Sequence, residues 1–70
     1  MKPGDLVRCS RACPEELHLI CDPDGDDSYF TTARGTFLVI DCDLDNLPWV
    51  KLITPAGIGW AYNTWLEVVP

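Results

Sequence analysis

Short apolar runs separated by turn-forming residues follow one another along most of the chain, and this pattern predicts strands. In the second half an apolar run covers 36–42, an alternating run covers 49–53, and two further runs cover 58–61 and 66–69. These runs are rich in β-branched and aromatic residues, which favour strands. Proline, glycine, asparagine and aspartate stand between them, where tight turns are expected. The pattern therefore predicts an all-β fold with short loops in its second half.

Alternation within the run 49–53 predicts which way its side chains point, because successive residues of a strand face opposite sides of a sheet. Val50 and Leu52 are expected to face the core. The other three residues of the run are then expected to face outward: Trp49, Lys51 and Ile53. The run thus reads as a strand with one buried and one exposed face.

The run 36–42 has apolar residues on both faces, as expected for a long, bent strand shared between the two sheets of a small barrel. Simple alternation places Phe37 and Val39 on the outside, together with the outward Ile53. An exposed apolar patch of this kind suits self-association. The patch therefore supports an alternative to a binding function: the protein is a structural subunit of a homo-oligomer or a virion component.

The first half of the chain has a less regular pattern. A first strand is predicted over 4–9. The run 17–21 is compatible with a strand, or with one to two turns of helix beginning at Pro14, because proline often occupies the first helical position. The strand is favoured because the β-prone run 28–32 follows across the turn-rich segment 22–27. The two runs would then pair as a hairpin with an acidic tip.

Two segments resemble a known family. Residues 59–69, GWAYNTWLEVV, resemble the ending of bacterial and phage SH3-like domains, and residues 1–7, MKPGDLV, resemble the start of small stand-alone phage proteins of this type. The resemblance implies a single small SH3-like barrel of five to six strands over 1–70. It also implies the loops of that fold: a long RT-type loop over 10–34, an n-Src loop over 42–48, a distal hairpin over 54–57 and a 3₁₀ turn over 62–64 before the last strand.

The same resemblance points to a binding groove. Trp49 stands where SH3 domains carry the tryptophan that walls their peptide groove, and Tyr62 falls on the turn that borders it. Trp65 is a further candidate contact, and packing within the chain is the alternative role for both tryptophans. The Ala-Leu-Tyr-Asp-Tyr motif of eukaryotic signalling SH3 domains is absent, since residues 6–9 read LVRC. Recognition of proline-rich peptides is therefore not implied.

The net charge of −6 is concentrated in one part of the chain. Seven aspartates and a single arginine lie between 22 and 46, and they account for the whole of it. Five scattered Lys and Arg residues do not form the basic cluster that phosphate backbones require, so no nucleic-acid partner is expected. A basic protein or peptide is the favoured partner on electrostatic grounds. The acidic residues expected to flank the groove are Asp24, Asp26, Asp43 and Asp45.

The chain contains no pattern of a signal peptide and no apolar run close to the roughly 20 residues needed to cross a bilayer. We therefore expect no membrane partner and a cytoplasmic location, which is the host cytoplasm if the protein is phage-encoded. Together with the groove, these observations predict a small protein–protein interaction module that binds a basic surface, acting on a host protein in the phage case.

No enzymatic or metal-binding motif is complete. Three aspartates have the 1-3-5 spacing of a calcium loop: Asp41, Asp43 and Asp45. However, Asn46 and Leu52 occupy the positions that require a glycine and a bidentate glutamate. His18 is the only histidine, and no nucleophile or acid pair is placed with it. The sequence therefore predicts no catalytic residues, no metal site and no cofactor.

The four cysteines leave three interpretations open. They stand at Cys9, Cys13, Cys21 and Cys42, and only the first two approach the spacing of a zinc knuckle. Disulfides need an oxidising compartment, which the expected cytoplasmic location does not supply. Free thiols are therefore favoured over zinc ligation and over disulfides, with Cys9 and Cys42 as small residues of the core.

Overall fold

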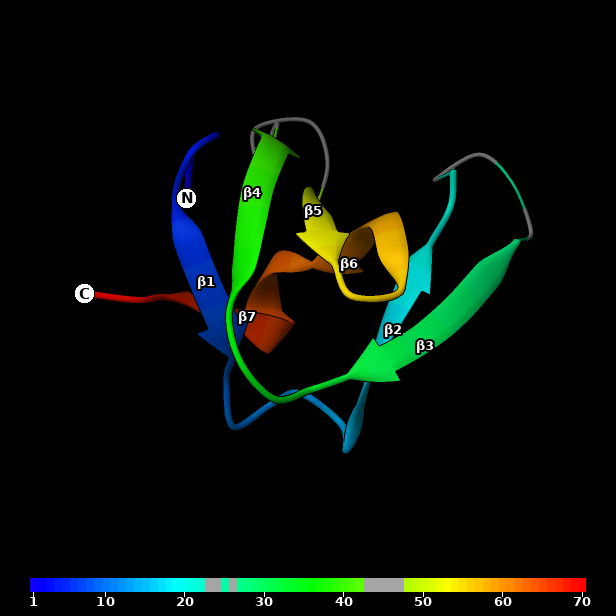
Figure 1. Ribbon diagram of the computed structural model, residues 1–70, viewed down its shortest axis with the longest axis horizontal. Coiled ribbons are helices and arrows are strands. Elements are labelled where there is room, and N and C mark those ends of the chain that lie inside the picture. The colour runs from blue at the N-terminus through cyan, green and yellow to red at the C-terminus, as the bar shows by residue number, and fades with distance from the viewer. Residues whose placement is uncertain (23–24, 26, 43–47) are drawn as a thin grey trace.

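The computed structural model describes residues 1–22, 25, 27–42 and 48–70. The chain is all-β and forms one curled antiparallel sheet, a half-barrel, in which the order of the strands is β3-β2-β6-β5-β4-β1-β7 (Figure 1). The described residues contain these elements: β1 (Leu6–Cys9), β2 (Glu16–Ile20), β3 (Ser28–Thr32), β4 (Phe37–Cys42), β5 (Trp49–Thr54), β6 (Gly57–Tyr62), the 3₁₀ helix η1 (Asn63–Trp65) and β7 (Leu66–Val68). The all-β class and the 3₁₀ turn before the last strand are confirmed.

The segment between β1 and β4 contains a hairpin rather than a helix. β2 and β3 pair antiparallel from Glu16 opposite Thr32 to Ile20 opposite Ser28. Because these two strands add to the remaining five, the described residues hold seven strands, where five to six were expected. The inward residues of β2, Leu17 and Leu19, are fully buried. Three residues of the expected acidic tip, at 23, 24 and 26, lie outside the described residues.

The direction of side chains in β4 corrects the expectation from simple alternation. Phe37 and Val39 are not outward: each is 1% exposed, and both belong to the core. The reason is the pairing of the strand, since Phe37 lies opposite the buried Val7 and Val39 opposite the buried Leu52. The expectation that Ile53 points outward is correct, because it is 44% exposed.

A β-bulge in β4 then changes which residues face the core. The register with β5 shifts between Val39 and Asp41, so that Ile40 is an extra residue on this strand. Beyond the bulge Asp41 is exposed, whereas Cys42 packs against the core opposite the buried Val50. The odd-numbered residues face the core before the bulge, and the even-numbered Cys42 faces it afterwards. This change explains why the run has apolar residues at both odd and even positions.

The core lies on the concave side of the sheet and draws on strands from both halves of the chain. Its members are Val7, Leu17, Leu19, Phe37, Val39, Val50, Leu52, Ala61 and Leu66. Cys9, Cys13 and Cys42 are half-buried at its margin. The interpretation of Cys9 and Cys42 as core residues is thus correct only in part, because neither is fully enclosed.

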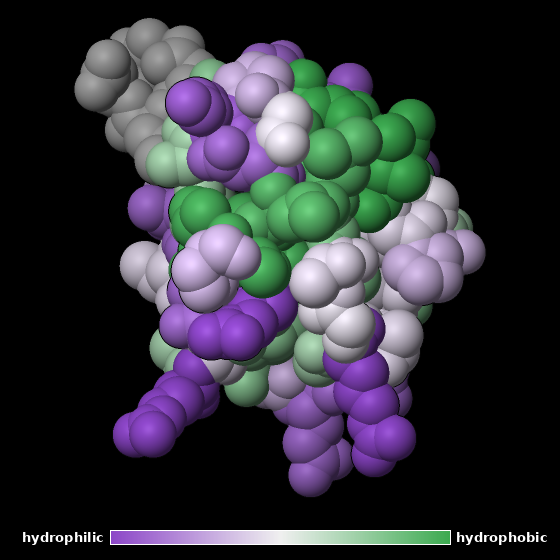
Figure 2. Space-filling model, turned by 60° about the vertical axis from the view of Figure 1, so that its left-hand side comes forward, coloured by the Kyte–Doolittle hydropathy of each residue, from purple (hydrophilic) through white to green (hydrophobic). Residues whose placement is uncertain are grey.

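The outer face of the sheet carries several exposed apolar side chains. Leu6, Leu38, Ile53 and Ile58 are each more than a third exposed. Figure 2 brings the side of the molecule with β1 and β4 toward the viewer and shows a continuous hydrophobic area there. The apolar content of this small sheet is therefore divided between a closed core and an open outer surface.

Candidate functional site

Three aromatic rings from three different elements form a chain of contacts with Tyr62 in the middle. The rings of Trp49 and Tyr62 are stacked, with centroids 4.0 Å apart and an interplanar angle of 24°. The ring of Trp65 meets Tyr62 edge-on, with centroids 4.9 Å apart and an angle of 83°. Offset stacks and edge contacts of this kind are the favoured aromatic geometries. We refer to these three residues as the aromatic cluster.

Strand register explains why the cluster forms. Trp49 is the first residue of β5 and Tyr62 the last residue of β6, and the two lie directly opposite each other. Because Val50 and Ala61 face the core, their neighbours Trp49 and Tyr62 face the outer side. The chain then turns through η1, whose last residue is Trp65. Two rings far apart in the sequence are thereby held in contact, and a third ring joins them.

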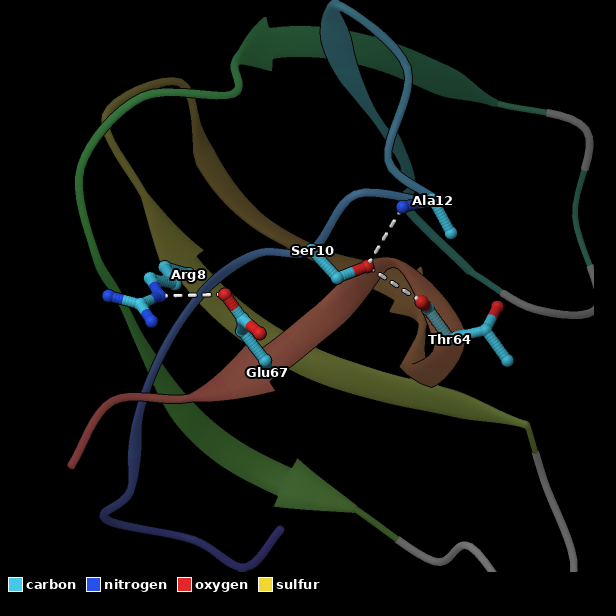
Figure 3. A network of polar contacts seen from close by, with 5 residues as sticks. All are labelled: Arg8, Ser10, Ala12, Thr64 and Glu67. Atoms are coloured by element: carbon cyan, nitrogen blue, oxygen red, sulfur yellow. Dashed lines mark hydrogen bonds and ion pairs between the residues drawn. The ribbon is translucent and has the colours of Figure 1, made fainter.

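Hydrogen bonds tie η1 to both sides of the structure. The amide of Asn63 donates to the carbonyl of Pro48, next to Trp49, at 3.0 Å. On the other side, the amide of Ser10 donates to the carbonyl of Trp65 at 2.7 Å, and its hydroxyl donates to the carbonyl of Thr64 at 2.9 Å (Figure 3). Both the residue before Trp49 and the backbone of Trp65 are therefore anchored, which holds the cluster in one arrangement.

The cluster is a half-open surface rather than a pocket. Tyr62 is 39% exposed, while Trp49 and Trp65 are half-buried and Trp65 also packs against the core. No pocket is found among the residues that the structure describes. Ring faces of this kind can stack on a proline ring or on the stem of an arginine or lysine. The two roles expected for Trp49 and Trp65, packing within the chain and contact with a partner, are thus compatible, because each ring is partly buried and partly exposed.

The four acidic residues expected beside the cluster lie outside the described residues: Asp24, Asp26, Asp43 and Asp45. Along the chain, Asp43 and Asp45 closely precede Trp49. Asp41 is described, and it is exposed at the end of β4. The acidic residues at 43 and 45 are therefore linked to the aromatic cluster by their closeness along the chain.

Two further aromatic contacts were not anticipated from the sequence. Phe30 is 59% exposed and stacks on His18 across the β2–β3 hairpin, with ring centroids 4.8 Å apart. Trp60 is half-buried on the outer face, and Nζ of Lys51 lies 5.6 Å from its ring centroid. The alternation of His18 with the buried Leu17 and Leu19 was a signal for the first contact, because it directs the imidazole outward.

The cysteines offer no metal site in the described part of the chain, where no three Cys, His, Asp or Glu side chains gather in a way that could hold an ion. All four thiols are free. Burial raises the pKa of Cys9 from its ordinary 9.0 to about 12, and the neighbouring Cys13 thiol adds to the rise. Cys9 is therefore protonated at neutral pH and a poor nucleophile.

Comparison of the chain with protein-family models, with curated proteins and with solved structures found no match. Within the described ranges, no helix has the length and apolar character needed to cross a membrane. The function is therefore inferred from the geometry of the aromatic cluster and from the charge of the chain.

Proposed function

We propose that the protein is a small, non-enzymatic interaction module that binds a basic protein or peptide surface through the aromatic cluster. The observation that carries this proposal is the contact of Tyr62 with both Trp49 and Trp65, three residues that come from three elements and are anchored from both sides. Half-exposed aromatic rings on a rigid support are typical of peptide-binding surfaces, because they lose little conformational entropy on binding.

The order of the elements supports the SH3-like interpretation of this surface. A hairpin stands in the long excursion between β1 and β4, a short turn joins β5 to β6, and η1 precedes the last strand, which pairs with β1. Those are the places that the resemblance assigns to the RT-type loop, the distal hairpin and the 3₁₀ turn. The resemblance to phage proteins at 1–7 and 59–69 further favours a host protein as the partner, in the host cytoplasm.

The charge of the chain selects the class of partner. A net charge of −6, with Asp43 and Asp45 close before Trp49 in the sequence, attracts basic segments and repels acidic ones. The rings can hold the aliphatic stems of arginine and lysine while the charged ends face the carboxylates. Binding should therefore weaken as salt screens the electrostatic part.

A peptide array tests the proposal. Arrays of peptides containing Arg, Lys and Pro are probed with the wild type, and a matched array carries Glu in place of each basic residue. Tyr62→Ala removes the central ring of the cluster, while Phe30→Ala removes an even more exposed ring on the hairpin and serves as the control. Thermal unfolding of each variant establishes that it is folded.

We expect basic peptides to be retained by the wild type and by Phe30→Ala. Tyr62→Ala should lose at least about tenfold in affinity, the usual consequence of removing a central aromatic contact. Changing Asp43 and Asp45 together to Asn should lower affinity and flatten its dependence on salt. Equal binding of the basic and the Glu-substituted arrays, or equal loss in both ring variants, would show that the cluster is not the site.

A further inference from the structure

A row of exposed aliphatic side chains crosses four strands on the outer, convex face of the sheet. Leu6 lies opposite Leu38, Leu38 opposite Ile53, and Ile53 opposite Ile58. Residues directly opposite each other point to the same face, so the four side chains form one continuous line. They are 49%, 38%, 44% and 53% exposed, respectively. We call Leu6, Leu38, Ile53 and Ile58 the aliphatic row.

Two opposite charges stand beside this row. Asp41 on β4 lies opposite Lys51 on β5, and both belong to the outer face. Within the described residues the only ion pair joins Arg8 to Glu67, so Asp41 has no ion-pair partner there. Nζ of Lys51 lies over the ring of Trp60, 5.6 Å from its centroid. The outer face therefore offers one negative and one positive group at matching positions on neighbouring strands.

One symmetry operation satisfies both features. A two-fold axis that runs parallel to the strands, between β4 and β5, would place Leu38 against the partner subunit's Ile53. Leu6 and the partner subunit's Ile58 would lie at the margin of this contact, because the outer face is convex. The same axis would place Asp41 against the partner subunit's Lys51, and Lys51 against the partner subunit's Asp41. A two-fold axis along the row would also stack the aliphatic side chains, but it would leave each charge facing a different part of the sheet. Self-complementarity of this kind is what a symmetric dimer interface requires.

We propose that the outer face of β1, β4, β5 and β6 is an interface between two copies of this chain, related by the axis parallel to the strands. The aliphatic row replaces the patch expected from alternation, because Phe37 and Val39 are in the core and only Ile53 of that patch is outward. The row itself is uncharged, and the two charges that each copy contributes to the contact, Asp41 and Lys51, are of opposite sign.

The exposed area sets the strength of the dimer. Four aliphatic side chains that are about half exposed present on the order of 300–400 Å² of apolar surface. A stable interface of standard size buries roughly 800 Å² on each partner. The face supplies about half of that, so we expect a reversible dimer with a dissociation constant on the order of tens to hundreds of micromolar.

Sedimentation velocity from about 10 μM to 1 mM, with charge reversals, tests the proposal. Asp41→Lys places two lysines against each other across the axis, and Lys51→Asp does the same with two acids. Each single variant should weaken dimerisation at least about tenfold, the cost of losing one or two charged contacts. The double variant Asp41→Lys/Lys51→Asp restores opposite charges across the axis and should return to within about threefold of the wild type.

Three further variants test whether dimerisation depends on this face in particular. Glu15→Lys makes the same charge change as Asp41→Lys at an exposed site before β2, and it should leave the dimer unchanged. Ile58→Glu places a charge in the most exposed position of the row and should weaken dimerisation at least about tenfold. Phe30→Ala removes an exposed ring on β3, outside this face, and should not affect dimerisation, while the peptide array reports on the proposed function separately.

A monomer at every concentration up to about 1 mM would overturn the proposal, because the expected dissociation constant lies well within that range. So would single charge reversals that behave like Glu15→Lys, because the charges would then lie outside the contact. A double variant that stays as weak as the single ones would overturn the placement of the axis, and with it the proposed pairing of Asp41 with the partner subunit's Lys51.

Discussion

Gly59 lies on β6 where β2 passes close to it, and Gly59→Ala tests the packing of the β2–β3 hairpin on the rest of the sheet. A Cβ at this position would lie 2.9 Å from Cβ of Leu19, 3.0 Å from Oη of Tyr29 and 3.4 Å from the carbonyl oxygen of Ile20. Carbon atoms in contact prefer about 3.5–4.0 Å. Two of these three atoms are fixed to the backbone of β2 and cannot swing away, so β2 and β3 must shift as a unit.

The cost of this shift exceeds the benefit of the substitution. Overpacking typically costs about 1–3 kcal/mol, whereas replacing glycine by alanine at an unstrained site gains only about 0.4–1 kcal/mol from the unfolded state. We therefore expect a net loss of about 1–2 kcal/mol. For a domain of this size that corresponds to a fall in Tm of roughly 4–16 °C. It is also a large part of the roughly 4–10 kcal/mol expected for the free energy of unfolding of a chain of this length.

Urea denaturation followed by tryptophan fluorescence measures the effect. Gly25→Ala is the matched control, because its Cβ would come no closer than 3.4 Å to Asp22, and it should stay within about 0.5 kcal/mol of the wild type. Tyr29→Phe removes the hydroxyl, which donates to the carbonyl of Ile58 at 2.7 Å, and should cost about 1 kcal/mol alone.

The double variant Gly59→Ala/Tyr29→Phe provides the decisive comparison. Since the hydroxyl is one of the atoms that the new Cβ meets, the combined loss should be smaller than the sum of the two single losses by about 0.5 kcal/mol or more. If Gly59→Ala is no more destabilising than Gly25→Ala, β2 does not approach β6 as described. Strict additivity of the two losses would mean that the hydroxyl of Tyr29 is not part of the crowding.

Four other outcomes are expected. Phe37→Ala should lower the free energy of unfolding by about 3–5 kcal/mol, and a loss below about 1 kcal/mol in urea denaturation would contradict its place in the core. Arg8→Ala, which breaks the exposed ion pair with Glu67, should cost less than about 1 kcal/mol by the same measurement. At pH 8, iodoacetamide should modify the exposed Cys21 well before Cys9, whose pKa is raised to about 12 by burial, as peptide mapping would detect. Because the unfolded chain releases the Cys9 proton near its ordinary pKa of 9.0 and the folded chain keeps it to about 12, stability should fall as pH rises between these values.

Much of the aromatic cluster could be foreseen from the sequence, but its geometry could not. Trp49, Tyr62 and Trp65 were candidates because the end of the chain resembles SH3-like domains. Their contact depends on the register of β5 with β6, which sets Trp49 opposite Tyr62, and on η1, which turns Trp65 back toward them. Register is a non-local property, since a shift by one residue would send one of the rings to the other face.

The amino-acid pattern alone specified the all-β class and the position of most strands, because turn residues and β-prone runs act locally. It also determined the buried residues of β2 and β5, where strict alternation leaves one choice of face. The facing of β4 was decided only by tertiary structure: both of its faces are apolar, and pairing with β1 and β5 selects Phe37 and Val39 for the core. The aliphatic row likewise exists only in the folded sheet, because residues from 6 to 58 become neighbours when four strands align.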